Sequence, residues 1–251
     1  MAIEIIKQRT VCLNNSVSPI ALVYEHQDFL IVDKPPGIAV QDEDHNVGIL
    51  VVLCKQLQRE KLWLVHRLDK VTSGLLILAK SAEAASKLGK LFEARHIEKF
   101  YIALSCQKPK KKQGSVSGPM KKIRDGKWAL TTTGSAPAIT QFFSHSVAPG
   151  IRLFLLKPLT GKTHQLRVML KSLGSPILGD TLYKGQQCDR TYLHALSLRF
   201  EYDGQKVSIQ SPPTNGEYFQ TEEFSLVLQQ YLHPWLLSWP VLGRTTAPRI
   251  N

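Results

Sequence analysis

Apolar residues recur along the chain in short runs that end at polar turns, and these runs predict strands. Two of them form a predicted hairpin within 21–40, around a polar turn at 26–28 and before a Pro-Pro-Gly stop. Further strands are predicted over 99–106, 139–147, 150–158, 191–202 and 206–211. Several connections are too short for a parallel crossover, so the pattern favours a mostly antiparallel sheet with helices packed on it.

Helical periodicity is strongest where Ser81 can cap a helix that carries apolar residues on one side. A second helix ends at Gly174, a typical C-terminal cap, and a third has Asn46 as its candidate N-cap. The predicted helices cover 46–60, 81–96, 163–174 and 221–233. The tail beyond the last helix, up to residue 251, is predicted to be irregular.

The Lys-, Gly-, Ser- and Pro-rich segment 108–126 interrupts the pattern and is predicted to be a loop. The sequence contains no internal repeat and no linker that would cut it in two. With 251 residues, 43% of them hydrophobic, it can fill a substantial core. The prediction is therefore one mixed α+β domain over 1–251.

The chain carries 32 Lys and Arg against 20 Asp and Glu, a net charge of +12. This excess attracts polyanions and favours nucleic acid as partner, although basic membrane-surface proteins and other basic enzymes share it. No apolar run could span a bilayer and no secretion signal opens the sequence. The cysteines Cys12, Cys54, Cys106 and Cys188 form no metal or disulfide pattern, so reduced thiols in a cytoplasmic protein are expected.

Several common catalytic motifs are incomplete in this sequence. The segment TGKTH at 160–164 resembles a phosphate loop, but Leu156 stands where the Walker pattern requires glycine. No Gly-rich dinucleotide fingerprint, no H-x-x-x-H pair, no zinc-deaminase signature and no G-x-S-x-G turn is present. These absences disfavour nucleotide hydrolysis, a dinucleotide cofactor, a catalytic metal and serine hydrolysis.

One polar insert separates two apolar runs in the segment 62–80, LWLVHRLDKVTSGLLILAK. If 62–69 is extended, Val65, Arg67 and Asp69 project to the same side. A structural salt bridge would explain an Arg-Leu-Asp triplet. The polar stretches DKPPG and GKTHQLR, however, also lie where regular segments end, which is where rigid scaffolds carry functional residues.

Five blocks in order resemble the RluA-type pseudouridine synthases, enzymes that isomerise uridine in ribosomal and transfer RNA. They cover about 20–211 and read DFLIVDKPPGIAV, VHRLDKVTSGLLILAKS, EKFYIAL, TGKTHQLRVMLKSLGSPILGDTLYKG and TYLHALSLRF. The resemblance implies the pseudouridine synthase fold, a bent, mostly antiparallel sheet flanked by helices and loops. Lys162 departs from the usual Arg, and the basic region 108–135 differs from the commonest pattern.

The resemblance makes Asp69 the catalytic nucleophile, which would attack either C6 of the base or C1′ of the ribose. It pairs Arg167 with Asp69, so that the guanidinium favours the charged carboxylate. The alternative is that Arg167 only caps a surface. Tyr101 is expected to stack on the uracil and to help remove the proton from C5, whereas the alternative for a strand tyrosine is a place in the core.

A base must leave the helical stack before it can react, and Arg67 resembles the residue that fills the space left behind. Further contacts with the RNA near the flipped base are expected from His66, Lys34, Lys162 and His164. Possible phosphate contacts are Lys110, Lys111, Lys112, Lys121, Lys122 and Arg124. A solvated surface is the alternative interpretation of these charges.

The implied reaction is an isomerisation that needs no cofactor and no metal. The expected partner is an RNA stem-loop, transfer or ribosomal, bound by a monomer. Only about 20 residues precede the first block, too few for an N-terminal S4 domain. The main alternative is a non-catalytic RNA-binding or ribosome-assembly protein on the same fold, and a nuclease or deaminase is a third. A pure binder would gain nothing from a carboxylate near phosphates.

Overall fold

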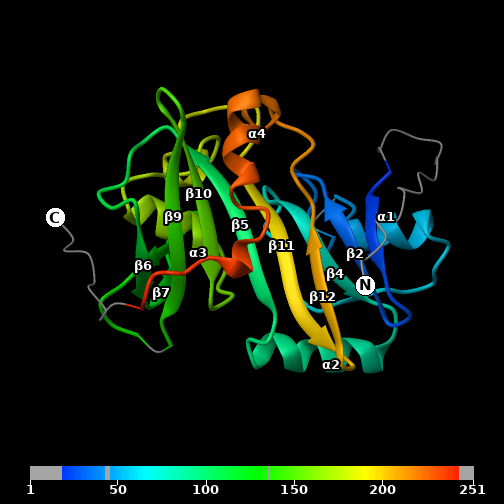
Figure 1. Ribbon diagram of the computed structural model, residues 1–251. Helices are drawn as coiled ribbons and strands as arrows, with labels where there is room; N and C mark the ends of the chain where they lie inside the picture. The colour runs from blue at the N-terminus through cyan, green and yellow to red at the C-terminus, as the bar shows by residue number, and fades with distance from the viewer. Residues whose placement is uncertain (1–18, 43–45, 135, 243–251) are drawn as a thin grey trace.

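A computed structural model describes residues 19–42, 46–134 and 136–242, and its main feature is a ten-stranded sheet (Figure 1). Its main path runs β1-β2-β4-β11-β5-β10-β9-β6, while β12 pairs with β11 and β3 with β4. The strands on the first half of the chain are β1 (Ala21–Glu25), β2 (Phe29–Lys34), β3 (Trp63–Leu64), β4 (Ser73–Ala79), β5 (Glu98–Ser105) and β6 (Gln113–Gly118). The later strands are β9 (Ala138–Ala148), β10 (Ile151–Pro158), β11 (Leu193–Tyr202) and β12 (Gln205–Gln210). Of these pairings only β4 with β11 is parallel, which confirms the expected α+β class with a mostly antiparallel sheet.

The α-helices of the described residues are α1 (Ile49–Gln56), α2 (Ala82–Glu93), α3 (Gln165–Ser172) and α4 (Glu222–Gln229). Short 3₁₀ turns occur at Thr181–Tyr183, Glu217–Gln220 and Pro234–Leu236. The predicted caps of two helices are confirmed. Ser81 Oγ accepts the amide of Ala84 at the start of α2, and Gly174 at φ +73° ends α3. In Figure 1, α3 lies behind β9 and β10, whereas the C-terminal segment with α4 crosses in front of them.

Strand β4 explains the continuous apolar run in the sequence, because each of its residues is buried. Leu76 and Leu78 pack into the larger core cluster, and Leu75 and Ile77 face a second cluster that includes Leu88 of α2. A strand covered on both faces has no polar side to alternate with. Its start therefore lies deep in the molecule, next to the polar insert.

Three sequence predictions of local structure are wrong. The segment 108–126 is not one loop, because it contains all of β6 and β7 (Met120–Lys122), and β7 pairs with β8 (Trp128–Leu130) in a separate hairpin. Asn46 is not the N-cap of α1, since that position belongs to Gly48. The extended segment assumed over 62–69 is a strand only at β3.

The junction between the polar insert and β4 requires glycine at position 74. Gly74 has φ +104°, and a Cβ there would lie 2.4 Å from the carbonyl oxygen of Ala195 on the parallel strand β11. We expect Gly74→Ala to lower the free energy of unfolding by at least about 1 kcal/mol. Gly89→Ala in α2 is the matched control. A Cβ at that position meets no atom within 4 Å, so the change should raise stability by about 0.8–1 kcal/mol. Urea denaturation measures both, and a fully stable Gly74→Ala protein would contradict the assignment.

Candidate active site

The loop 65–72 leaves the sheet because two strands share one edge of β4. Leu64 of β3 pairs with Leu78, whereas β11 pairs with β4 only at Ser73 and Gly74. The amide of Ile77, between these two regions, donates to Nε2 of His66 at 2.9 Å. The loop then turns at Asp69, whose carbonyl accepts the amide of Thr72. Asp69 thus lies at a tight reversal on the rim of the sheet.

His66 has contacts that fix this loop and occupy its ring with protein atoms. Besides accepting the Ile77 amide, the imidazole stacks on Phe92 of α2 with ring centroids 4.6 Å apart. Burial, with a smaller effect of the Lys99 charge, lowers the pKa of His66 to about 3. The ring is therefore neutral and holds the loop in place. These contacts do not favour the RNA contact that we expected from the sequence.

The expected RNA contact of Lys34 is wrong, because this side chain is fully buried. Its ammonium group donates to the carbonyl oxygens of Pro35, Ile38 and Lys70 at 2.8, 2.8 and 3.2 Å. Two of these lie in the Pro-Pro-Gly loop and the third follows Asp69. Lys34 therefore joins two loops beside the site and cannot touch RNA itself.

Arg167 of α3 is buried and contacts two carboxylates at once. Its Nε and one terminal nitrogen each donate to an Asp180 oxygen at 2.8 Å, a bidentate pair in which Asp180 is only 1% exposed. The other terminal nitrogen lies 3.5 Å from Oδ2 of Asp69. The expected pair between Arg167 and Asp69 is thus present, and a surface cap is excluded. Sequence reasoning missed Asp180, which carries no signal except its position within the PILGDTLY block.

A cleft of about 720 Å³ opens beside Asp69 and is formed by the loop 65–72, β5, β11 and the segment leading into α3. Five expected site residues line it together with Asp69: His66, Arg67, Tyr101, Lys162 and His164. Arg67 is exposed and, within the described ranges, forms no ion pair, so its side chain can move into the cleft. Arg167 also lines the cleft, whereas Lys34 does not.

Tyr101 is buried in the wall of this cleft, on β5. Burial and, to a smaller extent, the negative charge of Asp69 raise its pKa far above the ordinary value. The phenol therefore stays protonated at neutral pH. A neutral aromatic ring next to Asp69 is suited to stacking on a base. It is a poor proton acceptor.

Tyr183 connects the basic hairpin to the site. Its hydroxyl accepts the amide of Trp128 in β8 at 2.9 Å and lies 2.8 Å from Nδ1 of His164. Its ring centroid is 4.9 Å from the Arg167 guanidinium carbon. The hairpin therefore has a short path of contacts to the residues around Asp69.

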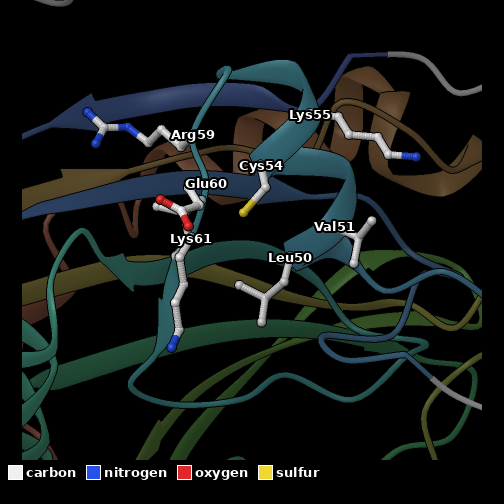
Figure 2. A pocket seen from close by; sticks show the side chains of 8 residues that line it. Leu50, Val51, Cys54, Lys55, Arg59, Glu60 and Lys61 are labelled. Atoms are coloured by element: carbon white, nitrogen blue, oxygen red, sulfur yellow. The ribbon is translucent and has the colours of Figure 1, made fainter.

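The six predicted phosphate contacts are exposed but lie outside the cleft lining. Lys110, Lys111 and Lys112 precede β6, and Lys121, Lys122 and Arg124 are on or next to the β7–β8 hairpin. A smaller hollow of about 390 Å³ beside α1 holds none of the expected site residues (Figure 2). Among the described residues, no group of three or more His, Cys, Asp or Glu side chains could hold a metal ion. No helix in the same ranges is long and apolar enough to cross a membrane.

The family profile for RNA pseudouridylate synthase matches residues 28–172, which include Asp69, Tyr101 and Arg167. This chain belongs to the RNA pseudouridylate synthase family. Its members are isomerases that act on RNA, and this synthase shares their fold.

A Haemophilus influenzae protein described as an RNA pseudouridine synthase is 52% identical over 221 residues, which are 87% of this chain and 99% of the relative. Ribosomal large subunit pseudouridine synthase C of Rickettsia bellii is 37% identical over 179 residues. That match spans 64% of this chain and 56% of the relative. The solved structure of human RNA pseudouridylate synthase domain containing 1 has a TM-score of 0.68 at 25% identity, covering 87% of this synthase and 97% of the human chain.

Asp180 should be as important for stability and turnover as Arg167, the residue with which it pairs. In Asp180→Asn, Arg167 loses its bidentate charged partner inside the protein, which costs about 3–5 kcal/mol of unfolding free energy. Turnover should fall as well, because the guanidinium is no longer fixed next to Asp69. Urea denaturation and pseudouridine formation measure the two effects. In the control Asp203→Asn, which breaks an exposed pair with Lys87, the loss should stay below about 1 kcal/mol.

The structural role of His66 predicts a pH dependence. The unfolded chain protonates this imidazole near 6.5, whereas the folded protein resists protonation down to about 3. Between these values the unfolded state binds more protons, so stability is lost as the pH falls. In His66→Gln the amide oxygen can still accept from Ile77 but does not titrate. The slope of the unfolding free energy against pH should therefore be smaller in the variant, by the equivalent of at most about one bound proton.

Urea denaturation over a pH series measures this difference. The buried His194, whose pKa burial lowers to about 4, is present in both proteins and cancels. Parallel pH profiles of wild type and variant would contradict the role given to His66.

Proposed function

We propose that this synthase converts specific uridines of structured RNA to pseudouridine, with Asp69 as the nucleophile. The observation that carries the proposal is the position of Asp69 at a loop reversal, facing a cleft and 3.5 Å from the buried Arg167. A fixed guanidinium orients the carboxylate beside it. The neutral phenol of Tyr101 gives the same cleft a surface for an aromatic base.

The reaction rearranges bonds without a net redox change. Attack by an Asp69 oxygen on C1′ of the ribose or on C6 of the base accompanies cleavage of the bond between C1′ and N1. The base turns and C5 bonds to C1′. In the C1′ route this bond displaces the carboxylate from C1′ as it forms, whereas in the C6 route the carboxylate leaves C6 afterwards. In both routes C5 loses its proton and N1 gains one. Because one carboxylate forms and releases the covalent link, covalent catalysis accounts for the step with this chain's own residues.

The target nucleotide has to leave its stack to reach Asp69, and unstacking costs a few kcal/mol. Arg67 stands two residues before Asp69, is exposed and lines the cleft. Its planar, charged side chain can stack between bases and occupy the space that the everted uridine leaves. We therefore assign Arg67 to base flipping, with Lys162 and His164 as further contacts at the mouth of the cleft.

The substrate of this synthase can be either ribosomal or transfer RNA. Relatives named for the ribosomal large subunit support ribosomal RNA, and a transfer RNA stem-loop remains the other substrate considered. Exposed cations on the β7–β8 hairpin could hold phosphates outside the cleft. The contact between Trp128 and Tyr183 fixes the position of this hairpin relative to the site. We expect a monomer in the cytoplasm, on the basis of the sequence alone.

Mapping pseudouridines in total RNA tests both the substrate and the nucleophile. The comparison uses a strain lacking the protein and the same strain complemented with wild type or with Asp69→Asn. A site that is absent in the deletion strain should return with wild type and stay absent with Asp69→Asn, because an amide cannot act as the nucleophile. The identity of that RNA names the substrate class.

Asp203→Asn, a change to an exposed carboxylate outside the cleft, is the matched control and should restore the site. If Asp69→Asn also restored it, the proposed mechanism would be wrong. If no site depended on the wild-type protein although RNA binding persisted, the non-catalytic alternative would be favoured.

A further inference from the structure

The end of the cleft next to α2 holds two cations that the reaction described above does not use. Lys99 lies on β5 two residues before Tyr101, and both line the cleft, whereas the intervening Phe100 does not. This alternation places Lys99 and Tyr101 on one face of the strand, about 6.5 Å apart along it. Arg95, between α2 and β5, lines the same end.

Among the residues that the structure describes, these cations have no carboxylate partner. Within the described ranges neither Lys99 nor Arg95 forms an ion pair, and the adjacent Glu98 is engaged by Lys157 at 2.6 Å and by Arg199 at 3.8 Å. Glu93 lines the same end of the cleft, but in the described part of the chain it forms no ion pair with either cation. The cleft therefore has an excess of positive charge beside the site of reaction.

Lys99 is also held in place. Its ammonium nitrogen lies 5.5 Å from the ring centroid of Phe92, whose ring stacks on His66 of the Asp69 loop. Burial, and then the charge of Arg95, lowers the pKa of Lys99. A partly desolvated cation facing a second cation is unfavourable by itself, and an anion between the two would relieve it.

We propose that Lys99 and Arg95 form a subsite for an RNA phosphodiester, which holds the phosphate of a nucleotide neighbouring the everted uridine. This inference rests on the proposed function, because it requires an RNA strand in the cleft. The base stacks at Tyr101 and the backbone continues along β5 toward α2. The subsite reads no base, so it fixes the position of the strand and adds affinity without sequence preference.

The variants Lys99→Met and Arg95→Gln remove one charge each, and methionine keeps most of the apolar stem of Lys99. Lys90→Gln is the matched control, because Lys90 is an exposed cation on α2 outside the cleft lining. Glu93→Gln removes the negative charge at the same end. Thermal unfolding establishes that each variant is folded.

Affinity for a labelled oligouridylate is measured over a salt series. The slope of log K against log salt should fall in magnitude by about 0.7 for each phosphate that Lys99→Met or Arg95→Gln no longer neutralises. Lys90→Gln should match wild type, and Glu93→Gln should bind more tightly, because it removes a repulsion. A merely structural role for these residues would not produce opposite effects at Glu93 and Lys99.

Turnover on RNA from the deletion strain supplies a second measurement. Lys99→Met and Arg95→Gln should raise KM and leave kcat close to wild type, as expected for weaker binding outside the reacting atoms. Unchanged salt slopes in both folded variants, or a slope reduced equally in Lys90→Gln, would overturn the subsite. That result would leave isomerisation by Asp69 intact. Conversely, an active Asp69→Asn protein, found together with the reduced salt slopes of Lys99→Met and Arg95→Gln, would overturn the mechanism and not the subsite.

Discussion

The buried guanidinium of Arg167 is the group on which the site depends. A charged side chain with 4% exposure is stable only if its hydrogen bonds are satisfied, and Asp180 satisfies two of them in a bidentate pair. The pair fixes α3 against the turn that carries Asp180. Only because this side chain is immobile can its remaining nitrogen face Asp69, which comes from a loop 98 residues earlier in the chain.

The loop that carries Asp69 exists because the ladder of β4 is interrupted. β3 and β11 occupy different parts of one strand edge, and the backbone between them needs other partners. His66 supplies one by accepting the Ile77 amide, and Lys34 joins the neighbouring carbonyl groups. Side chains for which the sequence predicts RNA contacts therefore act as structural supports for the nucleophile. The reactive carboxylate is held by a set of hydrogen bonds that replaces regular strand pairing.

Much of the framework was predictable because its signals are local. Ser81 and Gly174 act as caps through their own backbone and side-chain chemistry, and the apolar run of β4 reflects burial on both faces. The hairpin of β7 and β8 was missed because its lysines face solvent and suggest a loop, while its attachment through Trp128 to Tyr183 spans 55 residues. Asp180 was missed because its contact is likewise not between sequence neighbours. A carboxylate that pairs with a residue 13 positions earlier, across a turn, leaves no periodic pattern in the sequence.

Asp69, Tyr101 and Arg167, the residues that the resemblance singles out, line one cleft, but no motif shows how strongly each contact is made. Arg167 lies 2.8 Å from each Asp180 oxygen and 3.5 Å from Asp69. If both carboxylates were held equally, Asp69 would be neutralised by a bidentate pair and its oxygens would be poor nucleophiles. The longer contact orients Asp69 while leaving its oxygens available to attack. The asymmetry between the two carboxylates thus separates structural support from reactivity, and it follows from Asp180 being buried beside the guanidinium while Asp69 opens to the cleft.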